Sequence, residues 1–120
     1  MRTLADSRDL IEAALVYSGG THTYDDVITS VEKGEAQFWP GPRSCVITEV
    51  EDHPSRRILV MFLAAGSQVE LMAMEPGIIA WGKEQGCTQT RLVGRKGWGK
   101  SFLAETGWRD SGLIIMEKDI

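Results

Sequence analysis

The sequence predicts a single α/β domain over residues 1–120, with a mixed, mostly antiparallel, twisted sheet that carries helices on both faces. Three observations lead to this prediction. Two short amphipathic segments open the chain, a strongly apolar run lies at residues 57–64, and a helical segment with a cap follows that run directly. An apolar run of this length is typical of a central strand buried on both faces. A chain of this size buries roughly two thirds of its unfolded surface, which is enough for a core.

Both N-terminal segments have the features of short helices. The first is expected to begin after a cap at Asp6 or Ser7 and to end before Gly19. The second begins at Thr23 with a capping box in which Asp replaces the usual Glu, and it ends before Gly34. The apolar side chains that repeat at helical spacing are Leu10, Ile11, Ala14 and Leu15 in the first segment and Val27, Ile28 and Val31 in the second.

Three strands are expected next. The first covers residues 36–39 and stops at a Pro-Gly-Pro sequence. The second covers residues 44–51, and a turn at residues 52–55 connects it to the apolar strand at residues 57–64. Strands joined by such short turns are antiparallel neighbours.

The longest helix is expected over residues 67–85, because Ser67 and Glu70 form a capping box and Gly86 marks its end. Pro76 lies inside this range and predicts a kink or a break. The sheet is expected to splay just before this helix, after residues 64–66. The remaining elements are a strand at residues 88–93, a helix at residues 98–106 and a last strand at residues 108–118.

The net charge of −4 argues against broad nucleic-acid binding, which needs a basic surface. The charge is uneven along the chain. Residues 1–60 carry six basic and ten acidic side chains, whereas residues 81–120 carry seven basic and five acidic ones. A local positive patch is therefore expected around Arg91, Arg95, Lys96 and Lys100.

The two cysteines, Cys45 and Cys87, belong to no Cys-x-x-Cys or Cys/His cluster, so no metal site is expected. A disulfide between them stays an open alternative, although two buried thiols in a reducing compartment fit better. No apolar run approaches the ~18 residues of a membrane span. Met1 and Arg2 lead into an acidic amphipathic segment, not into the apolar core of a signal peptide. The expected location is the cytoplasm, with no membrane partner.

Two motifs in the last third of the chain carry a family resemblance. Trp-Gly-Lys-Glu-Gln-Gly-Cys runs from Trp81 to Cys87 before a strand, and Phe-Leu-Ala-Glu-Thr-Gly-Trp ends at Trp108. Together with the order of elements, these motifs resemble the GNAT superfamily of N-acetyltransferases over nearly the whole chain. The spacing of tryptophan, glycine and basic residues here is also similar to small GNAT-like proteins encoded by bacteriophages and prophages. Some relatives of that kind are virion-associated.

The resemblance implies acetyl-CoA as the cofactor of an active member, with its pyrophosphate at a glycine-rich loop before the longest helix. Free N–H groups and the positive end of the helix dipole suit an anion there. The matching cofactor-binding residues are Gly66, Ser67, Gln68, Arg95 and Lys96. The loop departs from the family pattern, because Gly66 is its single glycine and Glu70 brings a competing carboxylate into the first turn.

The general acid of the family also has no match. Many members use a Tyr four residues before the glycine of the late motif, and this position is Leu103, which has no proton to donate. Tyr17 and Tyr24 are the only tyrosines, and both fall in the N-terminal segments. No catalytic residue is assigned. The side chains that qualify as a base for an amine are Glu49, Glu51, His22 and His53.

Each candidate also has a plain structural explanation, which the sequence favours. Ser67 would be a helix cap, and Arg95, Lys96 and Lys100 would form a solvated basic edge. Trp81, Trp98 and Trp108 would pack in the core, and Cys87 would act as a small apolar residue. His22 and His53 would be isolated at the surface, and Trp39 would lie at a rigid strand exit.

Two hypotheses for function follow. The first is a GNAT-like protein that has lost efficient acetyl-CoA use and serves in binding or structure. Its expected partners are other phage or host proteins, with a phage virion as one location and no cofactor. The second is a true but divergent acetyl-CoA-dependent N-acetyltransferase in which a water replaces the tyrosine. The incomplete loop and the Leu103 position favour the first, and whether the protein is an enzyme stays open.

Overall fold

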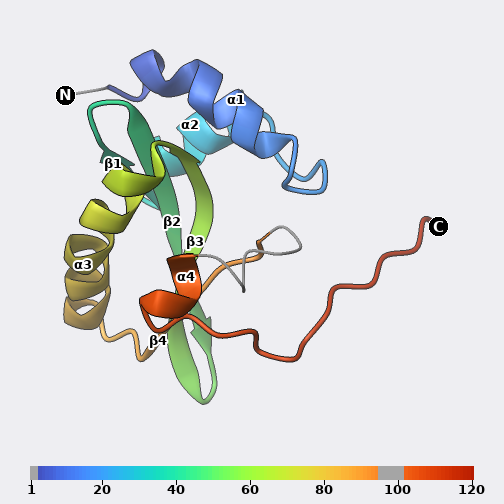
Figure 1. Ribbon diagram of the computed structural model, residues 1–120. Coiled ribbons are helices and arrows are strands. Elements are labelled where there is room, and N and C mark those ends of the chain that lie inside the picture. The colour runs from blue at the N-terminus through green and yellow to red at the C-terminus, as the bar shows by residue number, and fades with distance from the viewer. Residues whose placement is uncertain (1–2, 95–101) are drawn as a thin grey trace.

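The computed structural model describes residues 3–94 and 102–120 and confirms the α/β class. The helices are η1 (Ala5–Ser7), α1 (Arg8–Leu15), α2 (Tyr24–Glu32), α3 (Gln68–Glu84) and α4 (Phe102–Glu105). The strands are β1 (Ala36–Pro40), β2 (Ser44–His53), β3 (Arg56–Gly66) and β4 (Gln89–Arg91), which form one sheet in the order β1-β2-β3-β4. Helices α1 and α2 cover one face of the sheet, and α3 runs along the other (Figure 1).

The sheet is antiparallel from β1 to β3 and parallel at its last pair. Strands β2 and β3 pair along their whole length, whereas β4 pairs only with residues 58–60 of β3. Leu63 lies opposite Ile47 and Met61 lies opposite Thr48, so Phe62 is an extra residue that forms a bulge in β3. The pairing of β3 with β4 ends at Val60, so these strands separate earlier than the splay expected after residues 64–66.

One apolar cluster lies on each face of the sheet, because side chains along a strand alternate between faces. Cys45 and Ile47 of β2 point toward α1 and α2, and Val46 between them points toward α3. The buried members of the first cluster are Ile11, Tyr24, Val27, Ala36, Cys45, Ile47 and Leu63. The buried members of the second cluster are Val46, Leu59 and Ile78.

The helix caps agree in part with the sequence. The capping box at the start of α2 is confirmed, since Thr23 and Asp26 exchange side-chain and backbone hydrogen bonds. At α3, Ser67 accepts from the Glu70 backbone N–H, but the Glu70 side chain does not return the bond. Pro76 does not break α3, which is continuous over 17 residues. Pro76 is exposed, so water can satisfy the carbonyl that lacks its donor.

The C-terminal third differs most from the prediction. Strand β4 has three residues in place of the expected six, and the described part of the last helix is α4. The predicted last strand at residues 108–118 is wrong, because residues 109–120 form neither helix nor strand and are all exposed. A strand needs a partner for its backbone groups as well as apolar side chains, and none of the strands that the structure describes pairs with that segment.

Within the described ranges, no helix combines the length and the apolar character needed to cross a lipid bilayer.

Gly66 joins β3 to α3 at a point where the chain allows no side chain. Its φ of +109° lies in a region that favours glycine. A Cβ atom at this position would clash with the Arg43 carbonyl oxygen and would lie 2.6 Å from the Ser44 Cα. The glycine is therefore required by the close approach of β2 to the start of α3.

We expect Gly66→Ala to destabilise the fold by at least about 2 kcal/mol, since it adds backbone strain and a clash with rigid backbone atoms. Urea unfolding measures the loss. Gly77→Ala is the matched control, because Gly77 lies within α3 and a Cβ there meets no atom within 4 Å. The control should gain up to about 1 kcal/mol from helix propensity. Equal stability of the two variants would contradict the packing role of Gly66.

Candidate functional site

The candidate site is the opening that the separation of β3 and β4, the last two strands of the described sheet, leaves between them. Residues 61–66 of β3 have β2 on one side and no paired strand on the β4 side among the described residues. This free stretch leads directly into the N-terminus of α3. An exposed strand edge presents backbone N–H and C=O groups that can pair with an extended ligand.

A small pocket lies beside this opening, between the sheet, α3 and the α4 region. Its lining is mostly apolar and comprises Val46, Met61, Leu71, Met72, Glu75, Ile78, Leu103 and Trp108. The Trp108 indole Nε1–H donates to Glu75 Oε1 at 2.5 Å, which fastens the end of the α4 region to α3. Sequence analysis missed this pair, since a contact between residues so far apart in the chain leaves no local pattern.

Leu103 occupies the wall of this pocket. The structure thus brings the residue at the expected general-acid position next to Met61 and α3, where it contributes only apolar surface. Among the lining residues, Glu75 is the only one with a carboxylate, and this carboxylate accepts from the Trp108 indole N–H. The pocket can hold an apolar or thioester group, but its lining offers a departing thiolate no tyrosine.

The start of α3 carries three of the predicted cofactor residues: Gly66, Ser67 and Gln68. Ser67 is the N-cap, and Gln68 is exposed in the first turn. Gly66 has a structural reason for its identity, so a phosphate cradle is not needed to explain it. Arg95 and Lys96, the other two predicted residues, lie outside the described residues.

Glu70 does not compete for this helix start in the way the sequence suggested. Its carboxylate turns toward the β1–β2 connection, where it accepts from the Arg43 backbone N–H at 2.8 Å and from the Ser44 hydroxyl at 2.8 Å. The Arg43 side chain also pairs with it, at 3.2 Å from Nε. The Arg43 backbone N–H and the Ser44 hydroxyl lower the pKa of Glu70. The negative charge of the Glu70 carboxylate is thus offset by its hydrogen-bond donors and by the Arg43 side chain. The first N–H groups of α3 therefore keep their positive character.

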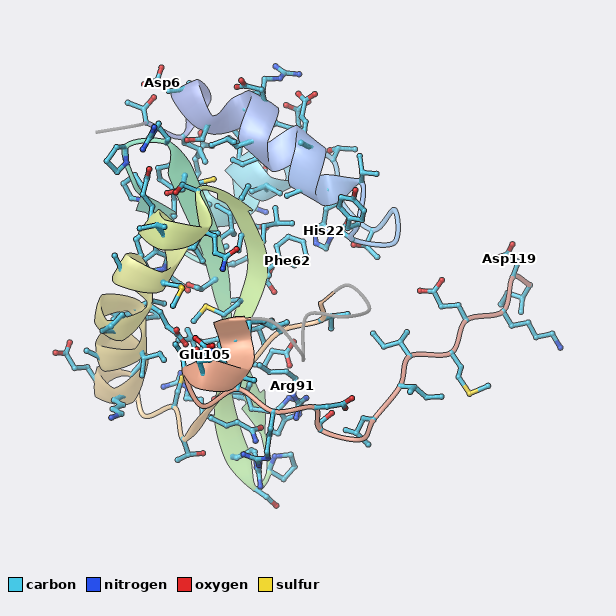
Figure 2. All side chains as sticks on the ribbon, in the orientation of Figure 1. Asp6, His22, Phe62, Arg91, Glu105 and Asp119 are labelled. Atoms are coloured by element: carbon cyan, nitrogen blue, oxygen red, sulfur yellow. The ribbon has the colours of Figure 1, made fainter. Side chains whose placement is uncertain are left out.

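The opposite face of the sheet places His22, Phe62 and Glu49 near the same opening. The His22 ring meets the Phe62 ring edge-on, with 4.6 Å between centroids (Figure 2). His22 is therefore half-buried, which corrects the expected isolated surface position. Burial raises the pKa of Glu49, and the nearby His22 partly offsets this effect. A carboxylate with a raised pKa near a bulge is a reasonable general base.

The other candidates have structural roles. Trp81 packs edge-on against Trp39, with centroids 5.6 Å apart, so core packing is confirmed for Trp81. Trp39 is likewise packed near the end of β1, in agreement with the expected rigid strand exit. Tyr24 is buried under Arg8, and the exposed His53 pairs with Glu51.

The two cysteines are not joined by a disulfide. Cys45 is buried as expected, while Cys87 is only half-buried, and its thiol has a pKa raised mainly by burial. A raised pKa disfavours the thiolate that a nucleophile requires. Over the part of the chain that the structure describes, no group of three or more His, Cys, Asp or Glu side chains is arranged to hold a metal ion.

Known structures share the overall fold. An acetyltransferase from Trypanosoma brucei superposes with a TM-score of 0.67 at 10% identity, over 99% of this chain and 96% of that one. Glucosamine-6-phosphate N-acetyltransferase from Arabidopsis thaliana gives 0.62 at 8% identity, over 98% and 94%. A protein from Thermus thermophilus gives 0.68 at 13% identity, over 100% and 98%. No protein-family model and no curated protein sequence matches the chain.

The fold is that of the GNAT acetyltransferases. The likeness covers nearly the full length of both chains in each comparison. With identities this low, the likeness establishes the GNAT scaffold, and the activity has to be argued from the site.

We expect Glu70→Gln to lower the melting temperature at pH 7. The pKa of Glu70 is lower in the folded chain than in the unfolded one, so its ionised form stabilises the fold. This contribution is full above the unfolded value of about 4.3 and is lost as the pH falls through the folded value. The difference between wild type and variant should therefore shrink below about pH 4. Glu84→Gln, at an exposed position on the same helix, is the control for the loss of one carboxylate from α3.

Glu49→Gln should have the opposite effect. Because burial raises the pKa of Glu49, its ionised form destabilises the folded chain, and the variant should melt higher at pH 7. The advantage should vanish once the pH falls below the unfolded value of about 4.3, where both side chains are neutral. Thermal melts at several pH values test this, with Glu32→Gln at the exposed end of α2 as control. A gain of the same size well below that value would show that the charge of Glu49 is not the cause.

Proposed function

We propose that the protein is a divergent acetyl-CoA-dependent N-acetyltransferase. The observation that carries the proposal is the free edge of β3 at residues 61–66, which runs straight into the N-terminus of α3. An edge that pairs with amides, followed by a helix start that attracts an anion, suits a ligand with an extended amide arm and a pyrophosphate. Acetyl-CoA has both parts in this order.

The hydrogen bonds that hold the Glu70 carboxylate support this proposal. Sequence analysis counted Glu70 against phosphate binding, but its carboxylate accepts hydrogen bonds from Arg43 and Ser44 instead. Ser67 and Gln68 then present the first N–H groups of α3 to an anion. Arg95 and Lys96 remain proposed ligands of the phosphates.

The chemistry requires an amine that has lost its proton. When bound, acetyl-CoA would supply the acetyl group as a thioester. Glu49 is proposed as the general base, directly or through a water, since its raised pKa favours proton uptake. His22 and Phe62 lie on the same face and would line the approach of the amine. Leu103 cannot protonate the thiolate, so that proton would come from water.

The competing proposal is a GNAT-like protein that binds or scaffolds without turnover. One observation favours it: Leu103 is placed in the pocket wall and leaves the acid position apolar. A role in a phage particle, with phage or host partners, rests on the sequence resemblance alone and stays a prediction. Acetyl-CoA binding and turnover of an amine separate the two proposals.

The sharpest test changes one charge at the helix start. Ser67→Asp and Ser67→Asn both keep a good N-cap, so both variants should fold. The aspartate adds a negative charge where the pyrophosphate would lie, and we expect it to weaken acetyl-CoA binding at least about tenfold. The asparagine variant, which has nearly the same shape, should bind like wild type. Calorimetric titration with acetyl-CoA, and with CoA as a second ligand, measures both.

Micromolar binding to wild type, lost in Ser67→Asp only, would support the cofactor site. Equal affinities of the two variants would contradict the placement of the pyrophosphate at α3. An absence of heat with millimolar acetyl-CoA would reject the enzyme and leave the binding role. Binding without acetylation of any amine in a broad screen would favour the scaffold proposal.

A further inference from the structure

We propose that the apolar pocket beside the opening takes the acyl chain of the cofactor, and that the protein prefers a four-carbon acyl group, as in butyryl-CoA, to acetyl. This preference rests on the proposed function, since the acyl chain would reach the pocket from the cofactor site at the start of α3. Met61 and Leu103, which both line the pocket, are the residues that would set the length of the chain.

The length of the free edge of β3 places the thioester. This edge covers residues 61–66, and α3 begins directly after it. The extended arm of CoA has about twelve bonds between the pyrophosphate and the sulfur, which is the length of about four residues of an extended chain. An arm that begins beside Gly66 and follows the edge would therefore bring the thioester to Phe62 and the acyl group to Met61.

Met61 belongs to the wall of the pocket. It lines the pocket together with Leu71 and Ile78 of α3, and Leu103 of α4 is a further part of the wall. An acyl chain that leaves the thioester at Met61 would therefore enter this pocket. The other face of the sheet, which carries His22, would remain for the amine.

The size of the pocket limits the length of the chain. Its volume is about 70 Å³. An apolar cavity of about 150 Å³ is enough for a benzene molecule, so this pocket has room for about half as many carbon atoms. About three carbons beyond the thioester carbonyl make a butyryl group. An acetyl group has only its methyl carbon there and would leave most of the pocket unfilled.

The lining of the pocket selects an uncharged chain. Among the described lining residues, Glu75 alone carries a carboxylate, and none carries a positive charge. The Trp108 indole N–H already donates to Glu75 Oε1, at 2.5 Å. An acyl group that ends in a carboxylate would be repelled by Glu75 and would leave its own charge unpaired, which is costly in an apolar pocket.

The experiment is calorimetric titration of the full chain with CoA, acetyl-CoA, butyryl-CoA and octanoyl-CoA. Butyryl-CoA should bind about tenfold more tightly than acetyl-CoA, because it buries about two further methylenes. Octanoyl-CoA should gain nothing more, since its chain is longer than the pocket. Succinyl-CoA has the same number of acyl carbons as butyryl-CoA but ends in a carboxylate. It is the matched ligand control and should bind no more tightly than acetyl-CoA.

Two substitutions at Leu103 change the pocket in opposite directions. Leu103→Phe fills it and should remove the advantage of butyryl-CoA over acetyl-CoA. Leu103→Ala enlarges it and should move the preference to hexanoyl-CoA. The ratio of two affinities is measured within each variant, so a general loss of affinity does not affect the result. Ala104→Phe adds a ring to α4 at an exposed position that does not line the pocket, and this matched control should keep the wild-type preference.

Failure of the acyl pocket and failure of the proposed function give different results. If CoA and acetyl-CoA bind but butyryl-CoA has no advantage, the acyl pocket is wrong and the cofactor site stands. An affinity that keeps rising to octanoyl-CoA would place the chain on the protein surface and would also overturn the pocket. An unchanged preference in Leu103→Phe would do the same. If none of these CoA compounds binds at millimolar concentration, the proposed function fails and the acyl preference fails with it.

Discussion

The contact between the start of α3 and the β1–β2 connection determines the geometry of the whole site. Gly66 lets the end of β3 approach the backbone of Arg43 and Ser44 with no side chain between them. The Glu70 carboxylate then accepts from both of these residues. Together these contacts fix the N-terminus of α3 at the point where β3 ends. If this junction moved, the helix start and the free strand edge would no longer be in line.

The separation of β3 and β4 lies close to the bulge in β3. Val60 is the last β3 residue that pairs with β4, and the bulge falls at Phe62. Phe62 meets the His22 ring on one face of the sheet, and Met61 lines the pocket beside α3 on the other. The opening is thus bordered by an aromatic and acidic face on one side and an apolar pocket on the other. Under the proposed function, this asymmetry would give the cofactor and the amine chemically distinct sides from which to approach.

Much of the fold was predictable because its signals are local. The capping box at Thr23, the apolar run of β3 and the cap of α3 each report on neighbouring residues, and each element formed close to its expected range. The candidate site was predictable only in part. Gly66, Ser67 and Leu103 came from a family pattern, whereas the Trp108–Glu75 bond, the bulge and the half-buried His22 depend on contacts between distant segments.

The sequence by itself determined the class of the fold, the order of most elements and the absence of a tyrosine at residue 103, because periodicity, caps and residue identity are properties of the chain. The tertiary structure decided the direction of the Glu70 carboxylate, the raised pKa of Glu49 and the state of residues 109–120. Each of these depends on what lies next to a group in space. The direction of a carboxylate depends on the groups that donate hydrogen bonds to it, and a pKa depends on how deeply the group is buried. A strand forms only where a partner satisfies the hydrogen bonds of its backbone.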